Sequence, residues 1–258
     1  MRTYLVVGAS RGIGLALVQE LLKDPTTHVL ATARSLPRSP GLYALTSSYP
    51  PTRLSILELD VADPASVERG AANAAALLSE HEGLDCLIHS AAMSLQELVP
   101  FEQVDIAAFH QELYTNTVAP LHVARSFLPL LRHGLSASDA ETAKKVVFVS
   151  SSLGSLELAP QSIGLSETYS VTKAGLGMIA RKWGAMLKEE GICTMVLHPG
   201  WVDTDLGNTV NAWFSEHLPA LQKIRPADCA AQCLQVIRDA RLEDAVAFYS
   251  HDGSRLPW

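Results

Sequence analysis

The chain has 258 residues, of which 48% are hydrophobic and 18% are charged, and its formal net charge is −7 at pH 7. The negative charge argues against nucleic acid or an anionic membrane surface as the main partner, because both attract basic proteins. No apolar run approaches the roughly 20 residues of a membrane span, and the first apolar stretch, 5–7, is too short for a signal-peptide core. We therefore expect a soluble α/β protein without a cleaved leader.

Four cysteines are scattered along the chain: Cys86, Cys193, Cys229 and Cys233. The last two lie on one face of a predicted helix, but no histidine accompanies them, so core thiols are favoured over a metal site. Unpaired thiols are typical of a reducing compartment. We expect no bound metal and a cytoplasmic location.

Short apolar runs alternate with helix-length segments over almost the whole chain. The predicted strands are 5–7, 28–33, 54–59, 84–89, 145–149, 192–198 and 245–249. The predicted helices are 13–22, 65–79, 106–131, 167–188 and 227–238. This βαβ alternation, with strands that are apolar on both faces, predicts a doubly wound parallel sheet of about seven strands with helices on both faces.

No break in composition divides the chain, so we predict one domain over residues 1–258. The Pro-rich or polar intervals 35–51 and 134–143 are predicted as surface loops. The interval 208–226 mixes Trp213 and Phe214 with polar residues, which fits either a lid over a site or a packed helical hairpin. We predict a substrate-loop insertion at about 205–226.

A glycine-rich turn, Gly8-Ala-Ser-Arg-Gly12-Ile-Gly14, follows the first predicted strand and opens the first predicted helix. Glycines at these places allow a tight turn, a close approach of the backbone to a phosphate, and tight packing of helix on strand. The free N–H groups of a helix N-terminus then face the anion. The turn therefore predicts a dinucleotide site at the carboxyl ends of the strands.

The end of the second predicted strand indicates which nicotinamide cofactor fits. An acidic residue there would bind a ribose 2′-hydroxyl and repel a 2′-phosphate, but this strand ends in Arg34, and Arg11 lies inside the glycine turn. Guanidinium groups bind phosphate through paired hydrogen bonds. We expect NADP(H) to be preferred over NAD(H); the alternative is that both arginines are simply solvated.

Tyr169 and Lys173 place a phenol and an ammonium four residues apart on one face of a predicted helix. A free phenol, with a pKa of about 10, is a poor acid or base near neutrality. A nearby cation stabilises the phenolate and lowers that pKa, as a general acid and base requires. The spacing alone also occurs on solvated helix faces, so its significance depends on the other motifs.

Taken together, these motifs resemble the short-chain dehydrogenase/reductase family over essentially the whole chain. In chain order they are Gly8, Gly12 and Gly14, then Asp60-Val61, Asn116, Ser150-Ser151, Tyr169 with Lys173, and the segment Pro199-Gly200-Trp-Val-Asp-Thr204. The run from Ser150 to Ser155 and the ending 252–258 look most like the sniffer-type carbonyl reductases and their fungal relatives. The resemblance implies a single-domain Rossmann fold and a carbonyl reductase-like enzyme.

The resemblance also implies the role of each residue. Tyr169 donates a proton to the carbonyl oxygen while hydride arrives from the nicotinamide, and Ser151 hydrogen-bonds the same oxygen. Lys173 holds the ribose hydroxyls and lowers the pKa of the tyrosine, and Asn116 keeps a water molecule for proton relay. The full set of residues expected to contact the cofactor is Gly8, Ser10, Arg11, Gly12, Ile13, Gly14, Arg34, Asp60, Val61, Ser90, Ala91, Asn116, Tyr169, Lys173, Pro199, Gly200, Val202 and Thr204.

One segment departs from the family pattern. Where the family usually has Asn-Asn-Ala-Gly, this chain has His89-Ser-Ala-Ala92, which adds a methyl group near the expected cofactor path. His89 is predicted to be a structural hydrogen-bonding residue, and His198 a strand-end residue. The departure motivates an alternative function, an NADP(H)-sensing binding protein without turnover. The expected ligand is a small carbonyl or alcohol substrate, and a homodimer or homotetramer is an alternative to a monomer.

Overall fold

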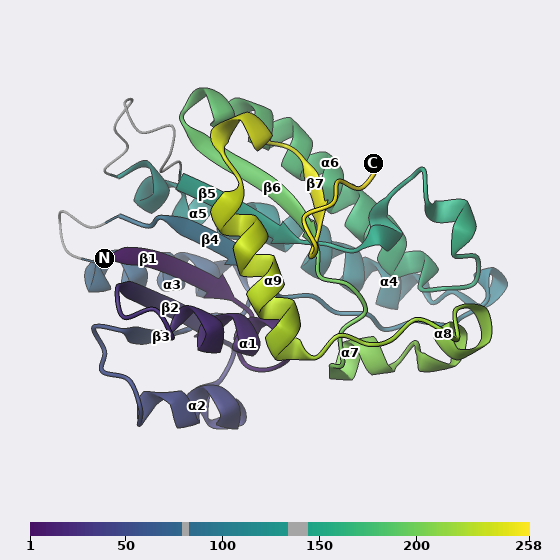
Figure 1. Ribbon diagram of the computed structural model, residues 1–258, viewed down its shortest axis with the longest axis horizontal. Helices are drawn as coiled ribbons and strands as arrows, with labels where there is room; N and C mark the ends of the chain where they lie inside the picture. Colours follow the sequence, from purple (N-terminus) through teal and green to yellow (C-terminus); the bar gives the residue numbers. More distant parts are fainter. Residues whose placement is uncertain (79–82, 134–143) are drawn as a thin grey trace.

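The computed structural model describes residues 1–78, 83–133 and 144–258 (Figure 1). Its sheet has seven strands, all parallel, in the order β3-β2-β1-β4-β5-β6-β7. The strands are β1 (Arg2–Val7), β2 (Thr27–Ala33), β3 (Leu54–Glu58), β4 (Cys86–His89), β5 (Lys144–Val149), β6 (Ile192–His198) and β7 (Phe248–Ser250). The predicted doubly wound parallel sheet is confirmed.

Helices cover both faces of this sheet (Figure 1). They are α1 (Gly12–Leu21), α2 (Pro40–Thr46), α3 (Pro64–Leu77), α4 (Ile106–Leu113), α5 (Ala119–Arg132), α6 (Glu167–Glu189), α7 (Asp205–Asn208), α8 (Asn211–His217) and α9 (Pro226–Asp239). Short helical turns are η1 (Leu36–Arg38), η2 (Phe101–Gln103), η5 (Ser152–Gly154), η6 (Ala159–Gln161) and η7 (Leu242–Asp244), and η3 (Tyr114–Val118) is a π-helical segment. In the described residues no helix is long and apolar enough to cross a membrane.

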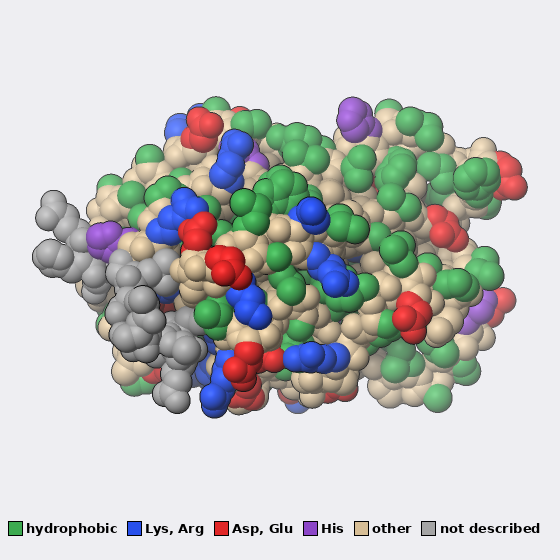
Figure 2. Space-filling view, turned by 90° about the horizontal axis from the view of Figure 1, so that it is seen from above, with side chains coloured by type: hydrophobic (Ala, Val, Ile, Leu, Met, Phe, Trp, Pro, Cys, Tyr) green, Lys and Arg blue, Asp and Glu red, His purple; other side chains and the backbone are tan. Residues whose placement is uncertain are grey.

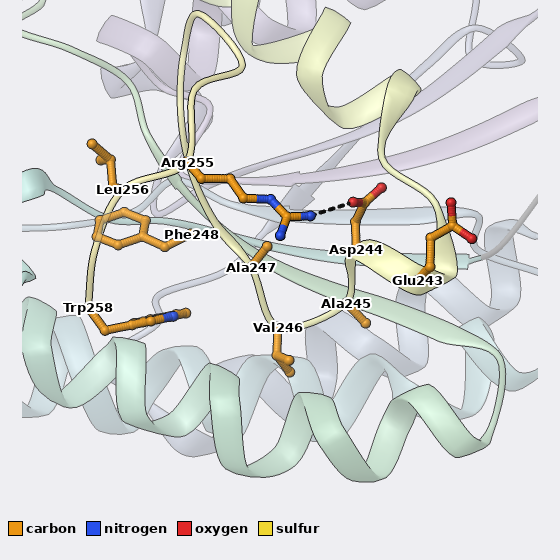
Figure 3. Close-up of a pocket in the computed structure, with 9 residues that line it drawn as sticks. All are labelled: Glu243, Asp244, Ala245, Val246, Ala247, Phe248, Arg255, Leu256 and Trp258. Carbon is orange, nitrogen blue, oxygen red and sulfur yellow. Dashed lines mark hydrogen bonds and ion pairs between the residues drawn. The ribbon is translucent and has the colours of Figure 1, made fainter.

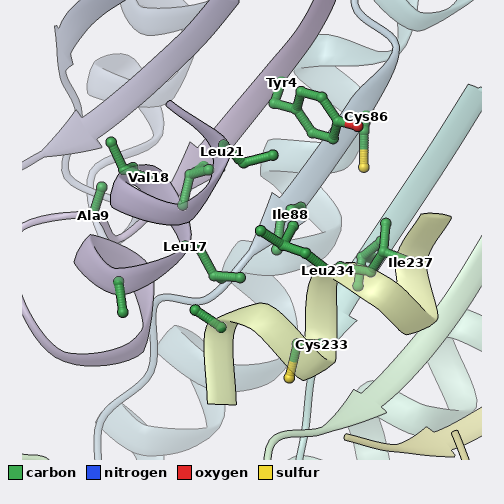
Figure 4. Close-up of a cluster of buried hydrophobic side chains, with 14 of the residues drawn as sticks. Tyr4, Ala9, Leu17, Val18, Leu21, Cys86, Ile88, Cys233, Leu234 and Ile237 are labelled. Atoms are coloured by element: carbon green, nitrogen blue, oxygen red, sulfur yellow. The ribbon is translucent and has the colours of Figure 1, made fainter. Parts of the chain in front are cut away.

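The two cores lie on opposite faces of the sheet because side chains alternate along each strand. In β1, Tyr4 and Val6 join the cluster under α1 and α9, whereas Leu5 and Val7 join the cluster under α3, α5 and α6. Figure 4 shows the first cluster, in which Leu17 of α1 and Leu234 of α9 point toward the sheet. Strands buried on both faces explain the continuous apolar runs in the sequence.

The cysteines are free and buried, as predicted for core thiols. In α9 the Sγ atoms of Cys229 and Cys233 are 3.8 Å apart. Cys229 also donates from Sγ to the carbonyl oxygen of Pro199 at 3.3 Å, so the helix is tied to the segment that follows β6.

Three predicted segments differ in detail from the structure. The helix predicted at 106–131 is interrupted by the π-helical segment η3. The interval 35–51 is not only loop, because it forms α2 around the buried Leu42. The interval 208–226, predicted as part of a substrate loop, contains α8, in which Trp213 is buried.

The predicted loop 134–143 lies outside the described residues, as does Ser79 at the end of one predicted helix. The assignment of 1–258 to one dinucleotide-binding catalytic domain, with a substrate-loop insertion at 205–226, stays a prediction.

Candidate active site

The glycine turn joins β1 to α1 with little space for side chains. Gly8 and Gly12 have φ values of +85° and +57°, which side chains disfavour. A Cβ atom on Gly8 would lie 2.7 Å from the Cα of Ala91, and one on Gly14 would lie 2.1 Å from the carbonyl oxygen of Gly8. No side chain among the described residues caps the N-terminus of α1. The turn therefore fits an anion bound by backbone N–H groups, as in a dinucleotide site.

Other residues of the predicted motifs follow the strands at the same edge of the sheet, because the carboxyl ends of parallel strands lie together. Ser90, after β4, donates its backbone N–H to Val7 at 2.9 Å, and Ser150, after β5, donates to Leu197 at 2.8 Å. Asp60 follows β3 and accepts from the backbone of Ala62 at 3.0 Å. This edge therefore brings together motifs that are far apart in the sequence.

The segment after β6 closes over the glycine turn. Gly200 has a φ of +83°, and Val202 pairs with Ile224 in a parallel bridge. Thr204 caps α7, with its Oγ1 accepting from the backbone N–H of Gly207 at 3.0 Å. A Cβ atom on Gly12 would lie 3.3 Å from the Cγ2 of Thr204. A side chain at Gly12 would therefore meet Thr204.

Tyr169 and Lys173 lie one turn apart in α6, and both are buried, with exposures of 8% and 2%. The Nζ atom of Lys173 lies 5.4 Å from the centre of the Tyr169 ring. The same Nζ donates to the carbonyl oxygen of Val149, at the end of β5, at 2.9 Å. Gly154 permits this arrangement, since a Cβ there would lie 2.8 Å from the Lys173 backbone.

Burial alters the acidity of both groups. It lowers the pKa of Lys173 from 10.5 to about 7, because the ammonium is removed from water. Burial, and secondly the negative charge of Glu112, raise the pKa of Tyr169 above its usual value of 10.0. The direction for Tyr169 is opposite to the lowering expected from the sequence, because burial disfavours the charged phenolate.

Asn116 lies in η3 and is 1% exposed. Its Oδ1 accepts from the backbone N–H of Met93 at 2.9 Å, and its Nδ2 donates to the Met93 carbonyl at 2.7 Å and to the Thr172 hydroxyl at 3.1 Å. The asparagine therefore links the loop after β4 to α6. π-Helical segments inside α-helices often mark functional sites.

Ser151 stands between β5 and η5, where its Oγ accepts from the backbone N–H of Leu153 at 3.2 Å. The neighbouring Ser152 donates its backbone N–H to Nδ1 of His198 at 3.1 Å. His198 ends β6, as predicted for a strand-end residue. This contact holds the serine segment against β6.

His89 is 1% exposed, and its Nε2 has no hydrogen-bond partner among the described residues. Burial, and secondly the charge of Lys173, lower its pKa to about 3, so the ring is neutral at physiological pH. The predicted structural hydrogen bond from this side chain is not formed at Nε2. The centre of the imidazole ring lies 6.5 Å from that of Phe148.

The two arginines predicted to bind a 2′-phosphate have different surroundings. Arg11 in the glycine turn forms an exposed ion pair with Asp205 of α7, with Nη1 and Oδ2 2.6 Å apart. Arg34 follows β2 and is exposed. The Arg11 side chain is therefore already paired across the crevice.

Aromatic side chains cluster beyond the crevice. The rings of Trp201 and Phe214 stack with centres 4.1 Å apart, and Nε1 of Trp213 donates to the carbonyl oxygen of Ile163 at 3.1 Å. Hydrophobic side chains gather over the right-hand part of the molecule in Figure 2, the part that carries α8. Exposed apolar residues between β4 and α4, between β5 and α6, and between β6 and α9 are Leu95, Leu98, Phe101, Leu156, Ile163, Leu206, Leu218 and Leu221.

A separate small cavity of 260 Å³ lies beside β7 (Figure 3). Its lining includes Phe248, Trp258 and the ion pair between Arg255 and Asp244, whose Nη2 and Oδ1 atoms are 3.0 Å apart. None of the predicted site residues lines this cavity, so it is not part of the candidate site.

Sequence reasoning overlooked Glu112, which is fully buried in α4. Its carboxylate accepts a short hydrogen bond from the backbone N–H of Leu95. In the sequence it resembles a solvated helix residue four positions before Asn116. A helical i, i+4 relation to the expected active-site asparagine is the signal that could have drawn attention to it.

A parallel sheet with a glycine turn at the carboxyl end of its first strand defines a dinucleotide-binding α/β protein. The family model for short chain dehydrogenases matches residues 2–215. The chain therefore belongs to this family, and it is an oxidoreductase of the carbonyl reductase-like type.

Relatives of known sequence or structure extend over the whole chain. An uncharacterised oxidoreductase of Schizosaccharomyces pombe is 28% identical, with 100% of this chain and 98% of the relative covered. The NADPH-bound carbonyl reductase from chicken fatty liver superimposes with a TM-score of 0.88 at 29% identity, covering 100% of this chain and 94% of that one. The carbonyl reductase Sniffer of Drosophila melanogaster superimposes with a TM-score of 0.87 at 26% identity, and 100% of each chain is covered. The predicted resemblance to sniffer-type carbonyl reductases is confirmed.

Proposed function

We propose that this chain is an NADP(H)-dependent oxidoreductase that reduces a carbonyl, or oxidises the corresponding secondary alcohol, with Tyr169 as general acid and base. The observation that carries the proposal is the buried Tyr169–Lys173 pair, with Nζ 5.4 Å from the ring centre, at the end of the sheet that bears the glycine turn. Exposed tyrosines and lysines at this spacing are common, but a buried pair is costly unless it is used.

Each side chain has a task in this scheme. NADP(H) supplies or accepts the hydride when bound. Tyr169 donates the proton to the carbonyl oxygen, and Ser151 donates a hydrogen bond to the same oxygen. Lys173 holds the ribose hydroxyls, and its ammonium lowers the pKa of the phenol once it is charged. Asn116, anchored on Met93 and Thr172, keeps the proton relay in place.

Arg34 supports the preference for NADP(H) because it is exposed after β2, where a carboxylate would favour NAD(H). Arg11 adds a second guanidinium at the glycine turn, provided that it leaves Asp205. The structural relative from chicken fatty liver carries NADPH. These observations favour a 2′-phosphate in this crevice.

The proposed substrate is a bulky apolar ketone, aldehyde or secondary alcohol. Two hydrogen bonds join the segments that carry the exposed apolar residues, from Ser166 N to the Glu97 carbonyl at 2.6 Å and from Trp213 Nε1 to the Ile163 carbonyl at 3.1 Å. Apolar surface at the mouth of a cleft is typical of sites for apolar ligands.

The proposed location is the cytoplasm, and the proposed assembly is a homodimer or homotetramer. Four free buried cysteines fit the reducing cytoplasm. Along α6 the side chains of Val171, Met178 and Met186 are 54%, 59% and 65% exposed. An apolar stripe of this kind fits a homodimer or homotetramer that pairs through α6, as an alternative to a monomer.

The test follows the absorbance of NADPH, and in parallel of NADH, against a panel of aliphatic and aromatic ketones and aldehydes. We expect turnover with NADPH, and higher kcat/KM for larger apolar carbonyls. A preference for NADH would contradict the cofactor assignment. Tight NADPH binding without reduction of any carbonyl would instead favour the sensing protein.

A further inference from the structure

The residues that follow β7, 251–258, fold back along that strand, and we call them the tail. The backbone N–H of Leu256 donates to the carbonyl oxygen of Phe248 at 2.8 Å, and Tyr249 and Arg255 form an antiparallel bridge. The strand β7 is the last of the sheet. The tail therefore pairs with the outer edge of β7 and carries its final side chain back toward α6.

That final side chain, Trp258, lies between β7 and α6 (Figure 3). Its ring centre is 5.3 Å from that of Phe248, and the guanidinium carbon of Arg181 is 4.9 Å from the centre of the indole. Gly177 leaves space for the ring, because a Cβ atom there would lie 3.0 Å from Cζ3 of Trp258. A large aromatic ring with a cation on its face is an effective anchor for a chain segment.

The part of α6 that Trp258 touches continues the row of side chains that carries the proposed catalytic pair. Tyr169, Lys173, Gly177 and Arg181 follow one another at intervals of four residues, and residues at this spacing form one ridge along a helix. The indole therefore contacts the ridge about one turn beyond Lys173.

The backbone of Trp258 holds a second element. The backbone N–H of Glu157 donates to the backbone oxygen of Trp258 at 3.0 Å. Glu157 lies in the stretch that joins Ser151 to Tyr169, the two residues expected to bind the carbonyl oxygen of the substrate. One residue of the tail thus fixes this stretch relative to α6.

Segment 155–163 of this stretch carries apolar surface and is held at two places. Leu156 and Ile163 are 73% and 78% exposed. The carbonyl oxygen of Ile163 accepts from Nε1 of Trp213 in α8 at 3.1 Å, and the hydrogen bond from Glu157 to the tail holds the other end. The position of this apolar surface therefore depends on contacts with two distant parts of the chain.

We propose that Trp258 is a positioning residue for substrate selection: it holds segment 155–163 against α6 and thereby determines which carbonyls the site accepts. The inference rests on the proposed function, because it assumes that the substrate binds beside Ser151 and Tyr169. The proposed acid and its lysine belong to α6 itself and need no contact with the tail. Loss of the indole should therefore change substrate preference more than the rate of the chemical step.

Trp258→Ala removes the ring from α6, and Trp258→Phe retains an aromatic ring there. The first measurement is hydrogen exchange at the Glu157 amide, followed by NMR without substrate. We expect exchange about tenfold faster in Trp258→Ala, because release of the tail opens this hydrogen bond, and a rate close to that of the parent chain in Trp258→Phe. The control is Tyr43→Ala, which removes an exposed ring from α2 and should leave exchange at Glu157 unchanged.

The second measurement compares kcat and KM for one large apolar ketone and one small ketone, with NADPH. In Trp258→Ala the ratio of kcat/KM for the large to the small ketone should fall about tenfold, the order that one methylene group in an apolar pocket provides. The kcat for the small ketone should stay within about twofold, and Trp258→Phe should restore most of the preference. A general loss of folded protein would instead lower kcat for both ketones equally.

If Trp258→Ala fails to fold, Arg181→Met takes its place. This variant removes the cation from the face of the indole and leaves the ring itself. It should accelerate exchange at Glu157 by about twofold or more, since a cation on an aromatic face contributes a modest stabilisation. No acceleration in Arg181→Met would then contradict the inference.

Unchanged exchange at Glu157 in Trp258→Ala would overturn the inference, as would an equal loss of kcat/KM for both ketones. Equal acceleration in Tyr43→Ala would also overturn it, because the effect would then reflect a general loss of stability. If exchange is faster in Trp258→Ala but the parent chain reduces no carbonyl, the anchoring of segment 155–163 by Trp258 stands and the proposed function falls.

Discussion

The ammonium of Lys173 lies over the ring of Tyr169, 5.4 Å from its centre, and its Nζ donates to the carbonyl oxygen at the end of β5. Two elements thus position one cation: α6 provides the side chain, and the central sheet provides the acceptor. The same burial that orders the pair lowers the pKa of the lysine to about 7. Burial of the ammonium therefore destabilises the fold, whereas the proposed function requires the ammonium at this position.

Lys173→Met is expected to stabilise the fold below neutral pH while abolishing turnover. Between about pH 7 and 10.5 the unfolded chain binds a proton that the folded chain does not, so stability rises with pH over this window and is lowest below it. Each pKa unit of lowering corresponds to about 1.4 kcal/mol, although loss of the bond to Val149 offsets part of the gain.

Urea unfolding at pH 6 and at pH 9 measures this effect. The control is Lys182→Met, on the exposed face of the same helix, which should change stability little at either pH. A Lys173→Met variant that is less stable than the parent at pH 6 would contradict this expectation. It would show that burying the ammonium costs the fold less free energy than the contacts of Lys173 contribute.

Acid is expected to unfold the protein through its buried histidines. The pKa values of His89 and His198 are lowered from 6.5 to about 3 and about 4, chiefly by burial. A group with a lowered pKa contributes stability that is present above pH 6.5 and is lost as the pH falls toward 3, because the unfolded chain takes up the proton first.

His89→Asn should flatten the dependence of unfolding free energy on pH between 6.5 and 4, whatever its effect on stability at pH 7. His110→Asn, at an exposed position in α4, is the matched control and should leave the slope as it is. An unchanged slope in His89→Asn would mean that the ring has the same pKa in the folded and the unfolded chain.

Asp205→Asn should release Arg11 for the cofactor. The ion pair between them is exposed on both sides, 74% and 73%, so its loss costs the fold little. We expect NADPH to bind roughly two- to fivefold more tightly, because breaking an exposed ion pair costs at most about 1 kcal/mol. The affinity for NADH should not change, because NADH lacks the 2′-phosphate.

Quenching of intrinsic fluorescence during titration with each nucleotide gives both affinities. Asp203→Asn is the control, because Asp203 pairs with Lys223 at 3.8 Å rather than with Arg11. Weaker NADPH binding in Asp205→Asn would indicate that the pair orients Arg11 instead of competing for it.

The order of elements could be predicted from the sequence because its apolar runs and glycine turn are local signals. The apolar run that ends at Val7 predicts a strand, and the glycine at position 8 predicts a turn directly after it; the structure has both. Lys173, one turn after Tyr169, bonds the carbonyl oxygen of Val149 at the end of β5, and Pro199 directly follows β6.

The remaining features depend on contacts between distant segments. The π-helical segment at Asn116 accompanies hydrogen bonds to Met93, 23 residues away, and no local propensity marks it. Glu112 is buried because the loop at Leu95 folds over it, and Arg11 is paired because α7 lies opposite the glycine turn. The direction of the Tyr169 pKa was mispredicted because the sequence shows the lysine but not the depth of burial.

The most direct measurement is the NADPH-dependent reduction of a good carbonyl substrate by Tyr169→Phe, beside Tyr43→Phe, which alters a tyrosine of α2 that is 59% exposed. The account predicts that Tyr169→Phe binds NADPH like the parent chain and loses at least about a hundredfold in kcat, as expected when a general acid is removed, whereas Tyr43→Phe retains full activity. Unchanged turnover in Tyr169→Phe would contradict the assignment of this phenol as the proton donor.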